Sequence, residues 1–175
     1  MCVMDDEILD LVNADDEVIG TINRNEADRL VTEKLGFIRA VDMFIVNDDG
    51  KLWIPTRTPD KRIAPNGLDY SVGGHVDSGE GYLEALMREA EEEINTQLLP
   101  NKLIYATKMP PAETPYFRAI YIYNMNDAPV YNPADFVSAD WLSPTEILEK
   151  IDSGVATKIS IKPTILKLIE LGFIK

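Results

Sequence analysis

Three glutamates, Glu89, Glu92 and Glu93, are the residues of this chain whose type and spacing could do chemistry. They stand in a stretch whose apolar residues, at about 100° per residue, share one arc of a helix surface. The residues of this arc are Leu83, Leu86, Met87, Ala90 and Ile94. Because steps of three and four residues reach adjoining turns, we expect the three glutamates, here called the helix glutamates, to border the buried face.

Carboxylates placed so closely repel one another, and partial burial increases that cost. A divalent cation would relieve both effects. Oxygen ligands at this density suit Mg²⁺ or Mn²⁺, which bind a few carboxylates and keep places for water and substrate phosphate. The alternative is a solvated acidic helix face that binds nothing.

The residues around the helix glutamates favour the metal site. Gly74 is followed by five residues, Glu80, seven residues and then Arg88, and this frame resembles the signature of the Nudix hydrolases position by position. The resemblance implies that Glu89, Glu92 and Glu93 bind the metal. It also implies that the carbonyl of Gly74 approaches the metal, and that Arg88 and Glu80 form a pair that orients the ligands.

Two positions depart from that signature, which has glycine and an aliphatic residue where this chain has Asn95 and Thr96. Asparagine is the usual second choice where a helix ends in the left-handed conformation. We therefore expect Asn95 to end the helix as glycine would.

The chemistry that the resemblance implies is the metal-dependent hydrolysis of a diphosphate in a nucleoside diphosphate derivative or a similar organic pyrophosphate. A carboxylate must accept the proton of the attacking water. Glu92 and Glu89 are the candidates on the helix, and Glu113 and Asp135 are candidates in loops. A Nudix domain that binds a nucleotide or a partner without turnover remains the alternative.

Within the family, the chain is most similar to the branch of isopentenyl diphosphate isomerase and its hydrolase-like relatives. The similarity includes the segments 10–13, 18–20 and 39–41 and the stretch from Arg57 to Asp69. The isomerase has its catalytic cysteine where this chain has Gly73, and it uses several histidines where this chain has only His75. The resemblance therefore implies a hydrolase-type relative, with the isomerase as a weaker alternative and the role of His75 left open.

Arg57 and Lys61 stand shortly before the glycine turn, and we expect them to bind substrate phosphate. The alternative is that both are solvent-exposed loop charges. We expect the large aromatic residues to lie in the core, and the alternative is that they form a platform on which a nucleobase stacks. These residues are Trp53, Trp141, Tyr116, Tyr121 and Tyr123.

Composition limits the partners. The net charge of −13 over 175 residues argues against a nucleic-acid polymer or an anionic membrane surface as partner. No apolar run approaches the length of about 18 residues that a membrane helix needs, and the acidic start does not resemble a signal peptide. The only cysteine, Cys2, indicates a reducing compartment, so the cytoplasm is expected. A small-molecule diphosphate is the expected partner, and a homodimer is left open.

The elements that must position these residues alternate between strands and helices. We expect a hairpin over 7–12 and 18–22, a helix over 25–34, strands over 40–46, 51–56, 102–108, 116–124 and 136–142, a helix over 144–152 and a last helix from 163 or 164 to 171. Ser143 and Glu146 form a capping box for the helix over 144–152. The pattern predicts a single α/β domain over 1–175, with the hairpin and short helix in 1–36 and the Nudix core in 37–175. The Nudix resemblance implies an α/β/α sandwich with a mixed sheet and a loop-helix-loop motif.

Overall fold

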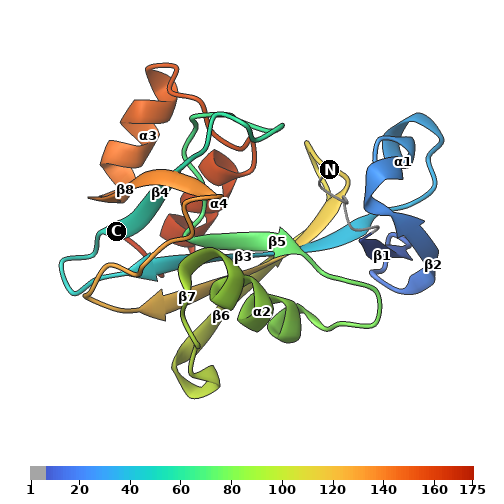
Figure 1. Cartoon of the computed structure of the whole chain (residues 1–175), viewed down its shortest axis with the longest axis horizontal. Helices are drawn as coiled ribbons and strands as arrows, with labels where there is room; N and C mark the ends of the chain where they lie inside the picture. Colours follow the sequence, from blue (N-terminus) through green and yellow to red (C-terminus); the bar gives the residue numbers. More distant parts are fainter. Residues whose placement is uncertain (1–6) are drawn as a thin grey trace.

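The computed structural model describes residues 7–175, so Cys2 lies outside the described residues. A six-stranded mixed sheet forms the centre of the molecule in the order β6-β7-β3-β4-β8, with β5 paired to β3 (Figure 1). Its strands are β3 (Ile38–Val46), β4 (Leu52–Arg57), β5 (Val72–His75), β6 (Leu103–Met109), β7 (Tyr116–Asn124) and β8 (Phe136–Leu142). β3 and β7 are parallel, and the other pairs are antiparallel.

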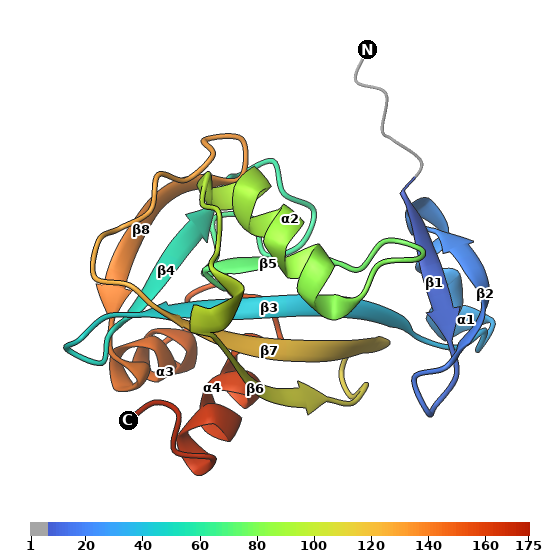
Figure 2. The ribbon, with the colours of Figure 1, turned by 90° about the horizontal axis from the view of Figure 1, so that it is seen from below.

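Helices cover both faces of this sheet (Figure 2). α2 (Tyr82–Ile94) lies on one face, whereas α3 (Pro144–Asp152) and α4 (Ile161–Glu170) lie on the other. Alternate residues of β3 pack on opposite faces of the sheet, because successive side chains of a strand point to opposite sides. Met43 packs in the cluster of α2, and Phe44 packs in the cluster of α3 and α4. The expected α/β/α sandwich with a mixed sheet is therefore confirmed.

The strands β3 and β4 diverge directly after the turn that joins them. Their pairing is confined to Val46 and Leu52, whereas β5 pairs with the other half of β3 from Ala40 to Met43. Two strands thus share one edge of β3. This arrangement places Gly73 and Gly74 inside the sheet, under α2. The expectation of a turn at Gly74 is therefore wrong, because both glycines are extended and paired with β3.

The N-terminal hairpin forms as expected from β1 (Ile8–Val12) and β2 (Val18–Asn23). The helix expected over 25–34 is wrong in extent: a 3₁₀ turn, Arg24–Glu26, is followed by a single helical turn, α1 (Arg29–Thr32). Leu30 is the buried residue of α1, and Val31 is exposed. Short helices depend on packing of an apolar face, and one buried leucine does not support a longer one.

The helix α2 is rotated about its axis relative to the expected orientation. Leu83, expected in the buried stripe, is 41% exposed, whereas Ala85 and Glu89 are buried. β5 lies against this side of the helix, so the buried arc is displaced toward the glutamates. Asn95 ends α2 with φ 49° and ψ 36°, the left-handed conformation expected for it.

The C-terminal helices form where the pattern predicts them. Ser143 and Glu146 make the capping box of α3, and α4 begins two residues earlier than the expected Pro163. Trp53 and Tyr123 are buried in the cluster beneath α2, as core positions. Among residues 7–175, no helix is both long and apolar enough to span a membrane.

Candidate active site

Gly74 lies directly against Glu89. A Cβ atom built at position 74 would stand 2.1 Å from the Cδ and Oε1 atoms of Glu89, so only glycine allows β5 and α2 to approach this closely. Glu89 is 9% exposed as a result. Burial raises the pKa of Glu89 to about 7, although the hydrogen bond and charge of Arg88 act in the opposite direction.

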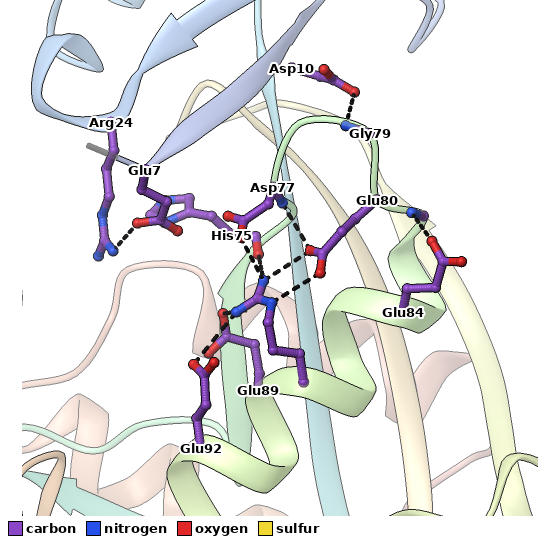
Figure 3. Close-up of polar contacts among 12 residues, drawn as sticks. Glu7, Asp10, Arg24, His75, Asp77, Gly79, Glu80, Glu84, Glu89 and Glu92 are labelled. Carbon is purple, nitrogen blue, oxygen red and sulfur yellow. Dashed lines mark hydrogen bonds and ion pairs between the residues drawn. The ribbon is translucent and has the colours of Figure 1, made fainter. Parts of the chain in front are cut away.

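Arg88 connects the helix to the loop before it through its contacts with Glu80 and Glu89, which are labelled in Figure 3. Its Nε and one terminal nitrogen donate to the two carboxylate oxygens of Glu80, both at 3.0 Å. The same terminal nitrogen donates to the carbonyl of His75 at 3.1 Å, and the other donates to Oε1 of Glu89 at 2.8 Å. The hydrogen bond from Arg88 lowers the pKa of Glu80. The geometry brings Glu80, Arg88 and Glu89 together in the arrangement of an orienting pair and its ligand.

Glu89 and Glu92 both face Arg88, whereas Glu93 faces β5. Oε2 of Glu93 accepts the backbone N–H of Gly73 at 2.9 Å, and burial raises the pKa of Glu93 well above its usual range. The Glu92 side chain is 58% exposed, with one oxygen 3.6 Å from Arg88. Within residues 7–175, no group of three or more His, Cys, Asp or Glu side chains is arranged to hold a metal ion.

The donor chemistry nevertheless fits a hard divalent cation. Two of the three carboxylates are held in surroundings that raise their pKa, which is where a cation is most stabilising. Exposed Glu92 is on the same helix, one turn from Glu89, and only a long contact with Arg88, at 3.6 Å, would be lost if its side chain turned toward a cation. A metal site would therefore require side-chain rotation around an already assembled backbone.

The N-terminal hairpin contacts the loop that precedes α2, and sequence reasoning did not anticipate this. Asp10 of β1 accepts hydrogen bonds from the Ser78 hydroxyl at 2.7 Å and from the Gly79 N–H at 3.3 Å. Glu7 forms an ion pair with Arg24 and lies 3.9 Å from Nδ1 of His75 (Figure 3). No spacing rule connects residues separated by 68 positions, so only the fold brings them together.

The side chain of His75 is largely buried, with 19% of its surface exposed. Its ring meets that of Tyr116 edge to face at 5.7 Å. Burial first, and then the charges of nearby cations, lower the pKa of His75 to about 3. His75 is therefore neutral near pH 7 and adds no positive charge to the site.

The two expected phosphate contacts are both held by carboxylates. Arg57 is buried and forms an ion pair with Asp69, and its Nε donates to the carbonyl of Ile63 at 2.8 Å. Nζ of Lys61 donates to Oδ1 of Asp135 at 2.5 Å. The interpretation of Arg57 as a solvent-exposed loop charge is wrong, since it is 9% exposed.

The loop candidates for proton acceptor lie in different places. Asp135 is engaged with Lys61, as described above. Glu113 lines a groove of about 520 Å³ between α1 and the loop joining β6 to β7, to which no residue of α2 or β5 contributes. The helix carboxylates remain the better-placed candidates.

Gly73, at the position of the isomerase cysteine, has no room for a side chain. A Cβ atom there would stand 2.6 Å from Oδ1 of Asp42, its partner in the register of β3 and β5. Asp42 is itself fixed by an ion pair with Arg118 at 2.5 Å and is 1% exposed. A cysteine at this position would have to displace a buried ion pair.

Comparison with known proteins gives a consistent family assignment. The family model described as the NUDIX domain matches residues 36–162. A Nudix hydrolase of Deinococcus radiodurans is 41% identical over 155 residues, covering 87% of this chain and 88% of that protein. A Nudix hydrolase of a Nostoc species is 39% identical over 177 residues, covering 98% of both.

Solved structures agree with this assignment. A crystal structure from Deinococcus radiodurans superposes with a TM-score of 0.82 and 37% identity, covering 92% of this chain and 98% of that one. A MutT protein from Methanosarcina mazei, at 18% identity and a TM-score of 0.59, shares the fold, covering 79% of this chain and 94% of that one. Together with the close approach of Gly74 to Glu89 and the pairing of Arg88 with Glu80, these matches show that the chain belongs to the Nudix family and is a Nudix hydrolase.

Proposed function

We propose that this protein hydrolyses the diphosphate bond of a nucleoside diphosphate derivative or similar organic pyrophosphate, with Mg²⁺ or Mn²⁺ as cofactor. The observation that carries the proposal is the buried carboxylate of Glu89, packed beneath Gly74 and linked through Arg88 to Glu80. Such an assembly leaves a buried acid with a raised pKa where β5 meets α2. It has no evident value for stability, because burying a carboxylate costs free energy.

In this proposal the helix glutamates and the carbonyl of Gly74 hold the metal. When bound, the cation supplies charge neutralisation for phosphate oxygens and acidifies a water molecule. Arg88 and Glu80 keep Glu89 in place, and either Glu89 or Glu92 accepts the proton of the attacking water. Arg57 and Lys61 bind the phosphates of the substrate.

Two alternatives are weaker. A binding module without turnover is disfavoured because the arginine and all three helix glutamates of the signature are present. We propose the isomerase-like branch as a relationship of descent and not of activity. Gly73 offers no thiol, and Asp42 occupies the space that a thiol side chain would need. The cytoplasm as compartment and a homodimer as assembly stay hypotheses, and light scattering in solution tests the second.

A hydrolysis screen in which the products are separated by chromatography tests the function. The substrates are nucleoside diphosphate sugars, dinucleoside polyphosphates, dinucleotides, nucleoside triphosphates and prenyl diphosphates, each with Mg²⁺ or Mn²⁺. We expect turnover of at least one class, and none of it in EDTA. Absence of turnover throughout would favour the binding module, and conversion of isopentenyl to dimethylallyl diphosphate would favour the isomerase.

A further inference from the structure

Two buried ion pairs lie beside Glu93, and neither includes a helix glutamate. Asp42 of β3 pairs with Arg118 of β7, and Asp69, in the segment just before β5, pairs with Arg57. Asp69 is 2% exposed, and its other oxygen, Oδ1, lies 2.8 Å from the Nζ atom of Lys158. A single buried carboxylate thus holds two cations.

Lys158 stands in the segment between α3 and α4, and the backbone of that segment is fixed. The N–H of Leu68 donates to the carbonyl of Ala156 at 2.9 Å, and Thr157 and Leu68 form a parallel bridge. A Cβ atom at Gly67 would stand 2.8 Å from the same Ala156 carbonyl, so the two segments lie in close contact. The Lys158 side chain is therefore positioned before any ligand arrives.

The partner of Lys158, Asp69, stands three residues before β5. Asp69 precedes Gly73 by four residues, a separation of at most about 13 Å in an extended chain, and the N–H of Gly73 binds Glu93. The positive charge of Lys158 lowers the pKa of Glu93 against the effect of burial, and it acts on Asp42 and His75 as well. Lys158 thus lies among groups from β3, β5 and α2.

Lys158 also has donors to spare. Its side chain is 19% exposed, and within residues 7–175 Asp69 is its one ion-pair partner. An ammonium group has three N–H donors. Arg57, which we also place at the phosphates, is more buried and has two donors engaged, and Arg88 is occupied by Glu80 and Glu89.

We propose that Lys158 binds a phosphate oxygen of the substrate, with Asp69 as the residue that positions its ammonium group. The inference rests on the proposed diphosphate hydrolysis. A chain of net charge −13 needs local positive charge to accept a polyanion, and Lys158 is a cation that buried Asp69 already holds in place. The sequence does not point to Lys158, because no motif surrounds it and its partner Asp69 lies 89 positions earlier in the chain.

The test compares Lys158→Ala and Lys158→Arg with the control Lys162→Ala. Lys162 forms an ion pair with Asp152 at the surface, and its side chain is 42% exposed, so its replacement changes the net charge equally. We expect Lys158→Ala to raise the KM of the hydrolysed diphosphate about tenfold with a smaller change in kcat. Lys158→Arg should restore most of the loss, and Lys162→Ala should match the parent. An unchanged KM in Lys158→Ala would overturn the inference.

Binding of inorganic pyrophosphate, measured by calorimetry in millimolar Mg²⁺, separates this inference from the proposed function. We expect the Kd to rise about tenfold in Lys158→Ala and to stay constant in Lys162→Ala. This result would support the role of Lys158 even if no substrate in the screen were hydrolysed. Turnover by the parent with equal pyrophosphate affinity in both variants would leave the function standing and remove the inference.

A measurement on the unaltered protein covers the case in which Lys158→Ala does not fold. Acylation of lysines followed by mass spectrometry should show that pyrophosphate with Mg²⁺ slows the modification of Lys158 several-fold and leaves that of Lys162 unchanged. Equal rates at Lys158 with and without pyrophosphate would count against the proposal.

Discussion

The Glu89→Gln substitution should stabilise the metal-free protein at alkaline pH and have much less effect at acid pH. Glu89 is 9% exposed, and burial raises its pKa from 4.5 to about 7. The folded state therefore holds this proton more tightly than the unfolded chain does. Its contribution to the free energy of unfolding is present below about pH 4.5 and is lost as the pH rises through about 7.

The magnitude follows from the two pKa values. A difference of about 2.5 between 4.5 and about 7 corresponds to about 3 kcal/mol, since one pKa unit is about 1.4 kcal/mol. This is an upper bound on the gain, because glutamine makes a weaker contact with Arg88 than a carboxylate does. The weaker contact with Arg88 lowers the stability of the variant by a similar amount at both pH values. Comparing each protein at two pH values therefore removes most of this contribution.

The assay is urea unfolding in EDTA at about pH 5 and about pH 8, with the free energy of unfolding obtained by linear extrapolation. The difference between Glu89→Gln and the parent should be about 2 kcal/mol more favourable to the variant at the higher pH. Glu92→Gln is the matched control, because it removes one negative charge from an exposed position of the same helix. Burial is the largest cause of the raised pKa of Glu89 and the charge of Glu92 is a lesser one, so the control should change the pH dependence less than Glu89→Gln does. Parallel pH dependence of Glu89→Gln and the parent would refute the claim that Glu89 is a strained, buried acid.

Three further predictions concern the same site. Mg²⁺ or Mn²⁺ should raise the Tm of the parent more than that of any variant with one helix glutamate changed to glutamine. Each of these substitutions should also lower kcat by about a hundredfold. Equal Tm shifts with full activity would contradict the metal site. Gly74→Ala should destabilise the protein by about 1–3 kcal/mol and abolish turnover, because its Cβ meets Glu89. Gly81→Ala, whose Cβ has only an ordinary contact at 3.5 Å, is the control for both thermal unfolding and activity. Lys61→Ala and Arg57→Ala should each raise KM about tenfold. Arg57→Ala should also lower the Tm, because buried Asp69 loses a partner. An unchanged KM would count against phosphate binding.

The parts of this protein that depend on neighbours along the chain can be predicted from its sequence. The helix start at the capping box of Ser143, the left-handed end at Asn95 and the strands from Tyr116 and Phe136 all follow from local propensity and capping. The spacing of Gly74, the acid at position 80 and the helix glutamates was sufficient for the family. These features need no long-range contact to be recognised.

Only the tertiary structure decided how those residues meet. The divergence of β3 from β4 admits β5, which turns the buried side of α2 from Leu83 toward Glu89. Contacts between Asp10 and the loop before α2, and between Asp69 and Lys158, join segments separated by 68 or more positions. Side-chain periodicity says which face of an element is apolar, but not which element will cover it, because that depends on packing among all of them.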